Sequence, residues 1–365
     1  MNICIIGNGL TSLALAKNLV NKKINVHIYY RNNKNILPSN RTLGISKSNF
    51  EYFCKKIFPI NKKKTWEIKK IEIFSEKIKK DKILDFDDNN KNLFLMLKNN
   101  ELYRIMMDQL MKEKFFKIKI IKDSIFYKKL LKEKKYDLII NCESNNYITK
   151  KYFSKKTFKN YNNIAFTTTL KHDVLQNKTA TQIFTKSGPI AFLPISATET
   201  SIVYSVNTNQ KSFTEFDIIN LIKKYNTKYL IKKIMKIDKF KLKSSNSRNY
   251  YYKNIIVFGD YIHKIHPLAG QGFNMTIRDI KVISEIIQDR IDLGLQIDSS
   301  VGIEFEKKTK HINYIFSNGI DFIYEFFNFE RKIKNKNLNN ILKFFGKNKV
   351  LSNAIIKFAD RGLNI

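Results

Sequence analysis

The first thirty residues follow a pattern that few folds can accommodate. Residues 3–6, ICII, form a short apolar run, and the turn GNGLTS follows immediately. A stretch with helical spacing of apolar residues comes next, and INVHIYY (24–30) then alternates as a strand does. This order of strand, glycine turn, helix and strand predicts a β-α-β unit. In that context a G-x-G-x-x-G motif binds a dinucleotide.

The dinucleotide-binding motif is matched at two positions of this unit and differs at two others. Gly7 allows the tight turn, and Gly9 lets backbone N–H groups approach a pyrophosphate at the helix N-terminus, where the helix dipole favours an anion. Ser12 replaces the third glycine and is still small enough for close packing. Tyr30 stands where an acid usually holds a ribose hydroxyl, and its phenol can also form a hydrogen bond. A β-α-β unit that binds nothing remains the alternative.

A second glycine-rich segment, GDYIHKIHPLAGQGFNMTIRD (259–279), differs from the rest of the chain, which is mostly Lys, Asn and Ile. Asp260 follows an apolar strand, at the strand end where open α/β sheets bind ligands. Pro267 fixes the chain direction, and Gly270 and Gly272 expose backbone to a flat ligand. The helix that starts here would direct its N–H groups at that ligand, which suits the electron-rich end of a flavin.

Several strand-like segments lie between these two motifs. Because they follow one another without helices between them, they predict a mostly antiparallel sheet. They are WEIKKIEIFS (66–75), IAFTTTLKHD (164–173), ATQIFT (180–185), GPIAFLPIS (188–196) and TSIVYSVN (200–207). Helical patterns dominate residues 210–236 and the chain from residue 277 onward.

The net charge of +35 invites a nucleic-acid interpretation, but only eight of the 67 basic residues are arginine. The lysines are spread over the whole chain among many Asn and Ile residues, as expected of an AT-rich coding sequence. We therefore expect a solvated basic surface that favours an anionic membrane over nucleic acid. Binding to nucleic acid stays open as a hypothesis that rests on charge alone.

The compartment is suggested by what the sequence lacks. The three cysteines are scattered, which favours a reducing environment over disulfides or a zinc site. No apolar run is long enough to span a bilayer, and the first residues lack the features of a signal peptide. We expect a cytoplasmic protein that can lie peripherally on the inner face of the cytoplasmic membrane.

The segment 259–279 resembles the second flavin motif of class A FAD-dependent monooxygenases. Its form HP-x-AGQG-x-N is similar to that of the aromatic-ring hydroxylases of ubiquinone biosynthesis. Four further segments resemble this family in the same order along the chain. They are RTLGIS (41–46), YNNIAF (161–166), ATQIFTKSGPIAFLPIS (180–196) and FEKKTKHINYIFSNGIDFIYEFF (305–327).

The resemblance implies an α/β fold in which an antiparallel β-sheet substrate domain interrupts a Rossmann-like FAD-binding domain, with a helical C-terminal region. We place the FAD-binding domain at residues 1–65, 96–157 and 250–290. The β-sheet domain then takes residues 66–95 and 158–249, and the C-terminal helices take residues 291–365.

The resemblance also implies a role for individual residues. Gly7, Gly9 and Ser12 would lie at the FAD pyrophosphate and Arg41 near the flavin. Gly259 and Asp260 would contact the ribityl or phosphate region; Pro267, Gly270, Gln271, Gly272 and Asn274 would line the isoalloxazine. Three positions depart from the family pattern: Tyr30, the pair Glu143-Ser144 in place of Asp-Gly, and Thr276 in place of glycine.

The implied activity is an FAD-dependent monooxygenase that uses NAD(P)H and O2 to hydroxylate the ring of a polyprenylated phenol in ubiquinone biosynthesis. The implied partners are this hydrophobic substrate, the membrane that holds it and other quinone-biosynthesis enzymes. Membrane contact could use the lysine surface and the aromatic run 322–329, although that run also fits ordinary helix packing.

The sequence identifies no catalytic base and no metal site. His263 and His266 are three residues apart, but they lie in a predicted loop without a third ligand. Two alternatives to the hydroxylase stay open. One is a related flavin hydroxylase, halogenase or reductase acting on another hydrophobic substrate. The other is a catalytically weak scaffold of a membrane-associated biosynthetic complex.

Overall fold

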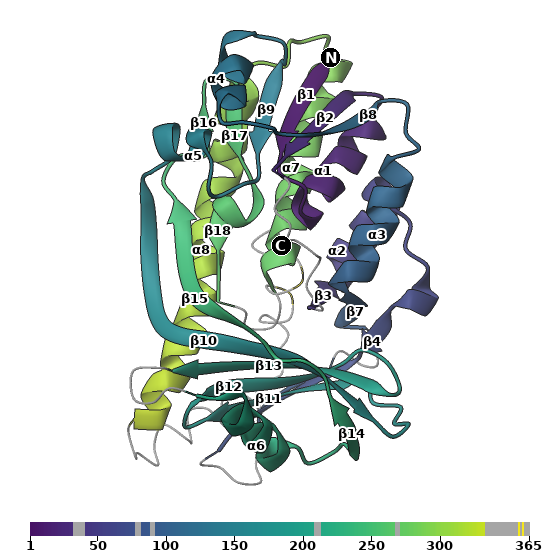
Figure 1. The fold of residues 1–365 in the computed structure, drawn as a ribbon, viewed down its shortest axis with the longest axis vertical. Helices are drawn as coiled ribbons and strands as arrows, with labels where there is room; N and C mark the ends of the chain where they lie inside the picture. The colour runs from purple at the N-terminus through teal and green to yellow at the C-terminus, as the bar shows by residue number, and fades with distance from the viewer. Residues whose placement is uncertain are drawn as a thin grey trace.

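The computed structural model describes residues 1–31, 41–76, 82–87, 92–207, 213–266, 271–332, 357 and 360. The end of the molecule that holds the N-terminus is built on a six-stranded, mostly parallel sheet (Figure 1). Its strand order is β16 (Tyr251–Tyr252), β17 (Ile255–Val257), β9 (Leu138–Asn141), β1 (Asn2–Ile6), β2 (Asn25–Tyr30) and β8 (Phe116–Ile120). Only the β16–β17 pair is antiparallel.

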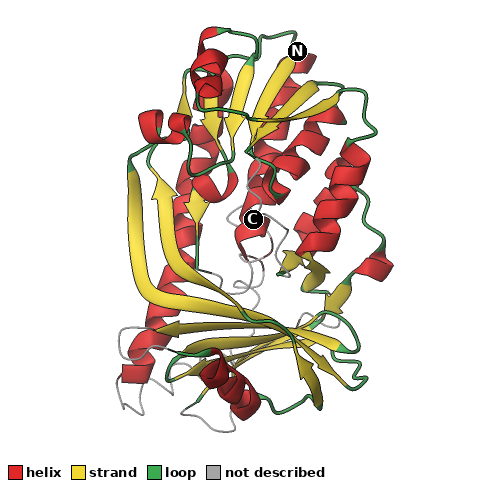
Figure 2. Cartoon of the chain, in the orientation of Figure 1, coloured by secondary structure: helices red, strands yellow, loops and turns green. Residues whose placement is uncertain are grey.

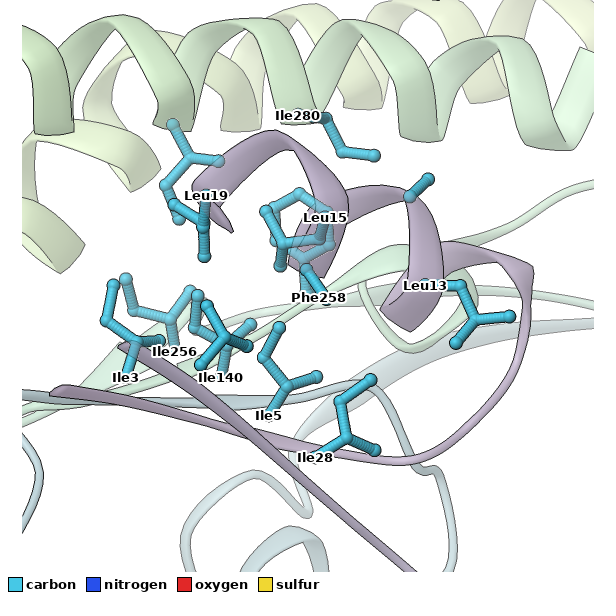
Figure 3. Packing of buried hydrophobic residues seen from close by; sticks show 14 of the residues in the cluster. Ile3, Ile5, Leu13, Leu15, Leu19, Ile28, Ile140, Ile256, Phe258 and Ile280 are labelled. Carbon is cyan, nitrogen blue, oxygen red and sulfur yellow. The ribbon is translucent and has the colours of Figure 1, made fainter. Parts of the chain in front are cut away.

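Helices cover both faces of this parallel sheet. Helix α1 (Leu10–Val20) packs between the sheet and α7 (Gln271–Asp292), and Figure 3 shows Leu13, Leu15 and Leu19 of α1 among the sheet isoleucines. Residues 3–6 are completely buried, as expected for a central parallel strand that is covered on both faces. The other helices of this region are α2 (Lys47–Tyr52), α3 (Asn99–Leu110), α4 (Ile125–Lys132) and α5 (Tyr147–Tyr152).

A nine-stranded, mostly antiparallel sheet forms the opposite end of the molecule (Figure 2). Its path is β18 (His263–Lys264), β15 (Asp238–Ser247), β10 (Lys156–His172), β13 (Glu199–Asn207), β12 (Gly188–Pro194), β11 (Thr179–Thr185), β5 (Lys70–Ser75) and β6 (Lys82–Asp87), and β14 (Ile231–Ile234) pairs with β10. Only β11 and β5 run parallel. Helix α6 (Glu215–Tyr225) buries Ile218 and Ile222 in an apolar cluster on this sheet.

Two features connect the ends of the molecule. The long strands β10 and β15 curve from the parallel sheet down into the antiparallel sheet (Figure 1). A small sheet of β3 (Thr42–Ser46), β7 (Phe94–Lys98) and β4 (Trp66–Ile68) adds a third layer of strands. Helix α8 (Ser299–Lys332) contacts α7, β16, β17 and β18 along its length.

The predicted fold class is confirmed: an α/β unit is interrupted by a mostly antiparallel sheet and followed by a helix. The residue bounds of the three predicted units stay predictions. None of the helices in the described part of the chain combines the length and the apolar character that crossing a bilayer requires.

Candidate active site

One large cavity brings the two glycine-rich segments together. Its volume is about 1470 Å³, whereas pockets for drug-sized ligands usually measure about 300–1,000 Å³. Residues from the parallel sheet, the small sheet and the antiparallel sheet line it. Of the predicted site residues, the lining includes Gly7, Gly9, Ser12, Arg41, Asp260 and Gly272. The cavity therefore has room for a dinucleotide and a second molecule.

The turn between β1 and α1 has the geometry of an anion site. Gly7 adopts φ +113°, which favours glycine, and its N–H donates to the Tyr29 carbonyl at 2.8 Å. A Cβ on Gly9 would meet no atom within 4 Å, so the chain leaves open space at the start of α1. No side chain caps this helix, and its first turn holds no acid. An anionic group that approaches here would meet unopposed N–H dipoles.

The second glycine segment lies directly against the first one. Gly259 adopts φ +66°, and a Cβ at this position would come within 2.6 Å of Thr11 Cγ2. Only glycine therefore lets the 3₁₀ turn η3 (Gly259–Tyr261) pack on the N-terminus of α1. This contact places the exposed Asp260 at the cavity.

Arg41 gives this part of the cavity a positive charge. Its guanidinium carbon lies 3.8 Å from the centre of the Phe240 ring, a cation–π contact that fixes the side chain. Burial lowers the pKa of Arg41, and the charges of Asp238 and Asp260 oppose that shift. The side chain stays protonated, because arginine has so high a pKa.

The start of α7 supplies open backbone and an amide without a hydrogen-bond partner. A Cβ on Gly272 would meet nothing within 4 Å. Gln271 is 4% exposed and is not part of the cavity lining, and neither atom of its side-chain amide has a partner among the described residues. The open backbone at Gly272, which does line the cavity, is therefore what this helix start offers a ligand. Pro267 and Gly270 lie outside the described residues.

Two predicted site residues point elsewhere. Asn274 is completely buried, and its amide binds β3: it accepts from Ser46 N–H at 2.9 Å and donates to the Gly44 carbonyl at 2.8 Å. It aligns α7 with β3 and does not line the cavity. Tyr30 packs against the core of the parallel sheet and is also absent from the lining.

The two histidines of the motif have different environments. His263 Nε2 lies 2.5 Å from Asp279 Oδ2, and Asn313 donates to the other carboxylate oxygen at 3.0 Å. This buried chain of contacts ties β18, α7 and α8 together. His266 instead stacks on Tyr324, with 4.4 Å between ring centres. Asp279 belongs to the glycine-rich motif, but the sequence alone did not show that His263 is its partner.

Lys156 is a cavity residue that sequence reasoning missed. It opens β10, its Nζ donates to the Tyr261 carbonyl at 3.1 Å, and it lies over the Tyr261 ring. Burial and the nearby charge of Lys264 lower the pKa of Lys156 to about 8. In a chain with lysines throughout, sequence alone gives no signal that separates this one from the rest.

The sequence model of the squalene epoxidase family matches residues 135–359, more than half of the chain. The chain belongs to the squalene epoxidase family. It is an FAD-dependent monooxygenase, and the family prediction is confirmed. The open backbone at Gly9 and Gly272, both in the cavity lining, fits the FAD that such enzymes use.

Comparisons with individual proteins agree with this family. The "Ubiquinone biosynthesis monooxygenase COQ6, mitochondrial" of Dictyostelium discoideum is 22% identical over 89% of this chain and 84% of that protein. The p-nitrophenol 4-monooxygenase PnpA of Pseudomonas putida has the same fold, with a TM-score of 0.73, 12% identity and coverage of 100% and 98%. HpxO of Klebsiella pneumoniae, solved with FAD and uric acid, also reaches 0.73, with 11% identity and coverage of 100% and 97%.

Proposed function

We propose that this monooxygenase hydroxylates the aromatic ring of a polyprenylated phenol in ubiquinone biosynthesis. The observation that carries the proposal is the apolar wall that faces the glycine segments across the cavity. This wall comes from strands of both the small and the antiparallel sheet: Ile68, Ile71, Phe94, Met96, Leu193 and Val203. A hydrophobic ring and part of its prenyl chain can lie there and bury apolar surface. The name of the Dictyostelium relative agrees with a monooxygenase of ubiquinone biosynthesis.

The proposed FAD site uses residues from both glycine segments. The backbone at Gly7 and Gly9 and the start of α1 would hold the pyrophosphate, while Asp260 would accept hydrogen bonds from ribityl hydroxyls. Gly272 and the first N–H groups of α7 would lie against the flavin ring, with Arg41 nearby as a fixed cation. FAD, when bound, carries electrons from NAD(P)H to O2 and provides the activated oxygen. The surrounding residues orient the phenol and exclude water.

We further propose that the protein is cytoplasmic, that it contacts the inner face of the membrane peripherally, and that it works beside other quinone-biosynthesis enzymes. Within the aromatic run 322–329, Phe322 is 70% exposed, whereas Tyr324 is only 2% exposed. Ile315 and Tyr314, on the same helix, are also exposed. Exposed apolar side chains on a strongly basic protein suit an anionic bilayer surface.

Product analysis under ¹⁸O2 tests the proposal. The FAD-loaded protein is given NADH or NADPH and a polyprenylated phenol in anionic vesicles. We expect one labelled oxygen on the aromatic ring. Gly272→Asp, provided that it folds, should lose this activity because the new carboxylate fills the open space beside the helix start. A flavin-loaded enzyme that oxidises no phenol would contradict the proposed substrate.

A second candidate reaction is epoxidation of a prenyl double bond, which the match to the squalene epoxidase model favours. A phenol with a saturated side chain separates the two reactions. Ring hydroxylation survives saturation of the chain, whereas epoxidation requires the alkene. Labelled oxygen on the chain of the unsaturated compound, together with no product from the saturated compound, would favour epoxidation.

A further inference from the structure

The end of β2 lacks the carboxylate that dinucleotide-binding folds usually place there. Tyr30 occupies the position, but its side chain belongs to the core and lies outside the cavity lining. The next residue, Arg31, is partly exposed at the end of the strand. A fold of this kind binds a ribose at this strand end. A hydrogen-bond acceptor for its hydroxyls must then come from another element.

Glu143 provides a carboxylate at this place. It follows β9, which lies beside β1, and β2 lies on the other side of β1. The side chain of Glu143 passes over the β1 turn: its Cγ would be 3.2 Å from a Cβ on Gly7. Burial raises the pKa of Glu143, and the positive charge of Arg31 opposes that shift, as do polar contacts with the Asn146 side chain and the Arg31 backbone. It thus reaches from the end of β9 to the end of β2.

The segment that carries Glu143 is held in place before any ligand binds. Asn141 is completely buried, and its Oδ1 accepts from Glu143 N–H at 3.1 Å and from Asn146 Nδ2 at 2.9 Å. Asn146 in turn caps α5 through a reciprocal pair of bonds with Thr149. Because these bonds fix the backbone on both sides of Glu143, little ordering is required when a ligand arrives.

We infer that Glu143 accepts the ribose hydroxyls of the adenosine half of FAD and so replaces the acid missing at position 30. The inference rests on the use of FAD in the proposed function. A carboxylate has about four acceptor positions, so polar contacts with two neighbours leave capacity for a ribose diol. Its half-buried position at the cavity is open to such a ligand. A charge-assisted bond of this kind is about twice as strong as one to a neutral phenol.

The Glu143 carboxylate could also weaken FAD binding, and because the two effects differ in sign the inference can be tested. A carboxylate beside the Gly7 turn could repel the pyrophosphate, and its removal would then tighten FAD binding. Under our assignment its removal weakens FAD binding. FMN has no adenosine ribose, so the assignment predicts no change in FMN affinity.

The test is equilibrium binding to the apoprotein, followed by quenching of flavin fluorescence. We expect Glu143→Gln to raise the dissociation constant for FAD about tenfold or more and to leave that for FMN unchanged. Glu51→Gln is the matched control, because Glu51 is an exposed acid on α2 that does not line the cavity. It should change neither constant. Glu143→Asp, which keeps the charge but shortens the reach, should also weaken FAD alone, and it serves if the glutamine variant unfolds.

Unchanged or tighter FAD binding in a folded Glu143 variant would overturn the inference, as would an equal loss of FAD and FMN. The readout does not depend on turnover. A protein that binds FAD with this pattern but hydroxylates no phenol would leave the inference standing and refute the proposed substrate.

Discussion

Burial of His266 makes the stability of the folded protein depend on pH. The His266 ring packs against both Tyr324 and Tyr161 and is 1% exposed, and neither nitrogen has a partner among the described residues. Burial lowers the pKa of His266 to about 3, because a charged imidazole would lose its hydration there. The unfolded chain binds this proton near its ordinary pKa of about 6.5. The folded state therefore loses stability as the pH falls below that value.

We predict that His266→Phe removes this pH dependence. Between pH 7 and pH 5 the wild-type free energy of unfolding should fall by about 2 kcal/mol more than that of the variant. Phenylalanine keeps an aromatic ring packed against the two tyrosines, so the variant should fold. Urea unfolding at several pH values measures the difference. Parallel pH profiles for the two proteins would show that His266 takes up its proton in the folded state.

At the scale of elements, Asn274 joins α7 to β3. Asn274→Ala leaves the Ser46 N–H and the Gly44 carbonyl without their partner in a buried place. We expect a loss of about 2–4 kcal/mol in the free energy of unfolding, because each unsatisfied group costs about 1–3 kcal/mol. FAD affinity should fall as well, since the same bonds align the start of α7 with the strand that follows Arg41.

Asn318→Ala provides the control for this prediction, because Asn318 is an exposed asparagine on α8. It should change neither stability nor FAD affinity. If Asn274→Ala loses stability and still binds FAD as tightly as the wild type, then the alignment of α7 with β3 does not matter for the cofactor.

The elements that the sequence predicts well are those with a local signal. The β-α-β unit at residues 2–30 combines a buried apolar run, a glycine turn and two periodicities, and it is confirmed. Strand β10 was expected from residue 164 but begins at Lys156, since its polar first half becomes a strand only by pairing with β15. The pairing of β3 with β7 joins segments far apart in the chain and has no local signature.

At the scale of the whole molecule, the sequence suggested that two glycine motifs share one ligand but could not show how they meet. The junction depends on Gly259 packing on Thr11, a contact between residues separated by most of the chain. Individual roles were harder to predict, because they depend on where side chains point. The resemblance placed Asn274 at the isoalloxazine, whereas its amide is bound to β3, and it marked Glu143 as a departure from the family, although this side chain lies at the cavity.

The central claim is that both glycine segments hold one FAD in one cavity, and titration of the folded apoprotein with FAD tests it most directly. We predict one FAD per chain for the wild type and loss of binding in both Gly9→Asp and Gly272→Asp. The Gly9 variant is informative because its backbone, with φ −73° and ψ 174°, suits an aspartate N-cap. It should therefore keep or gain thermal stability while its charge repels the pyrophosphate, and Gly9→Asn should bind more FAD than Gly9→Asp. A folded wild type that binds no FAD, or FAD binding that survives either Gly9→Asp or Gly272→Asp, would contradict the claim.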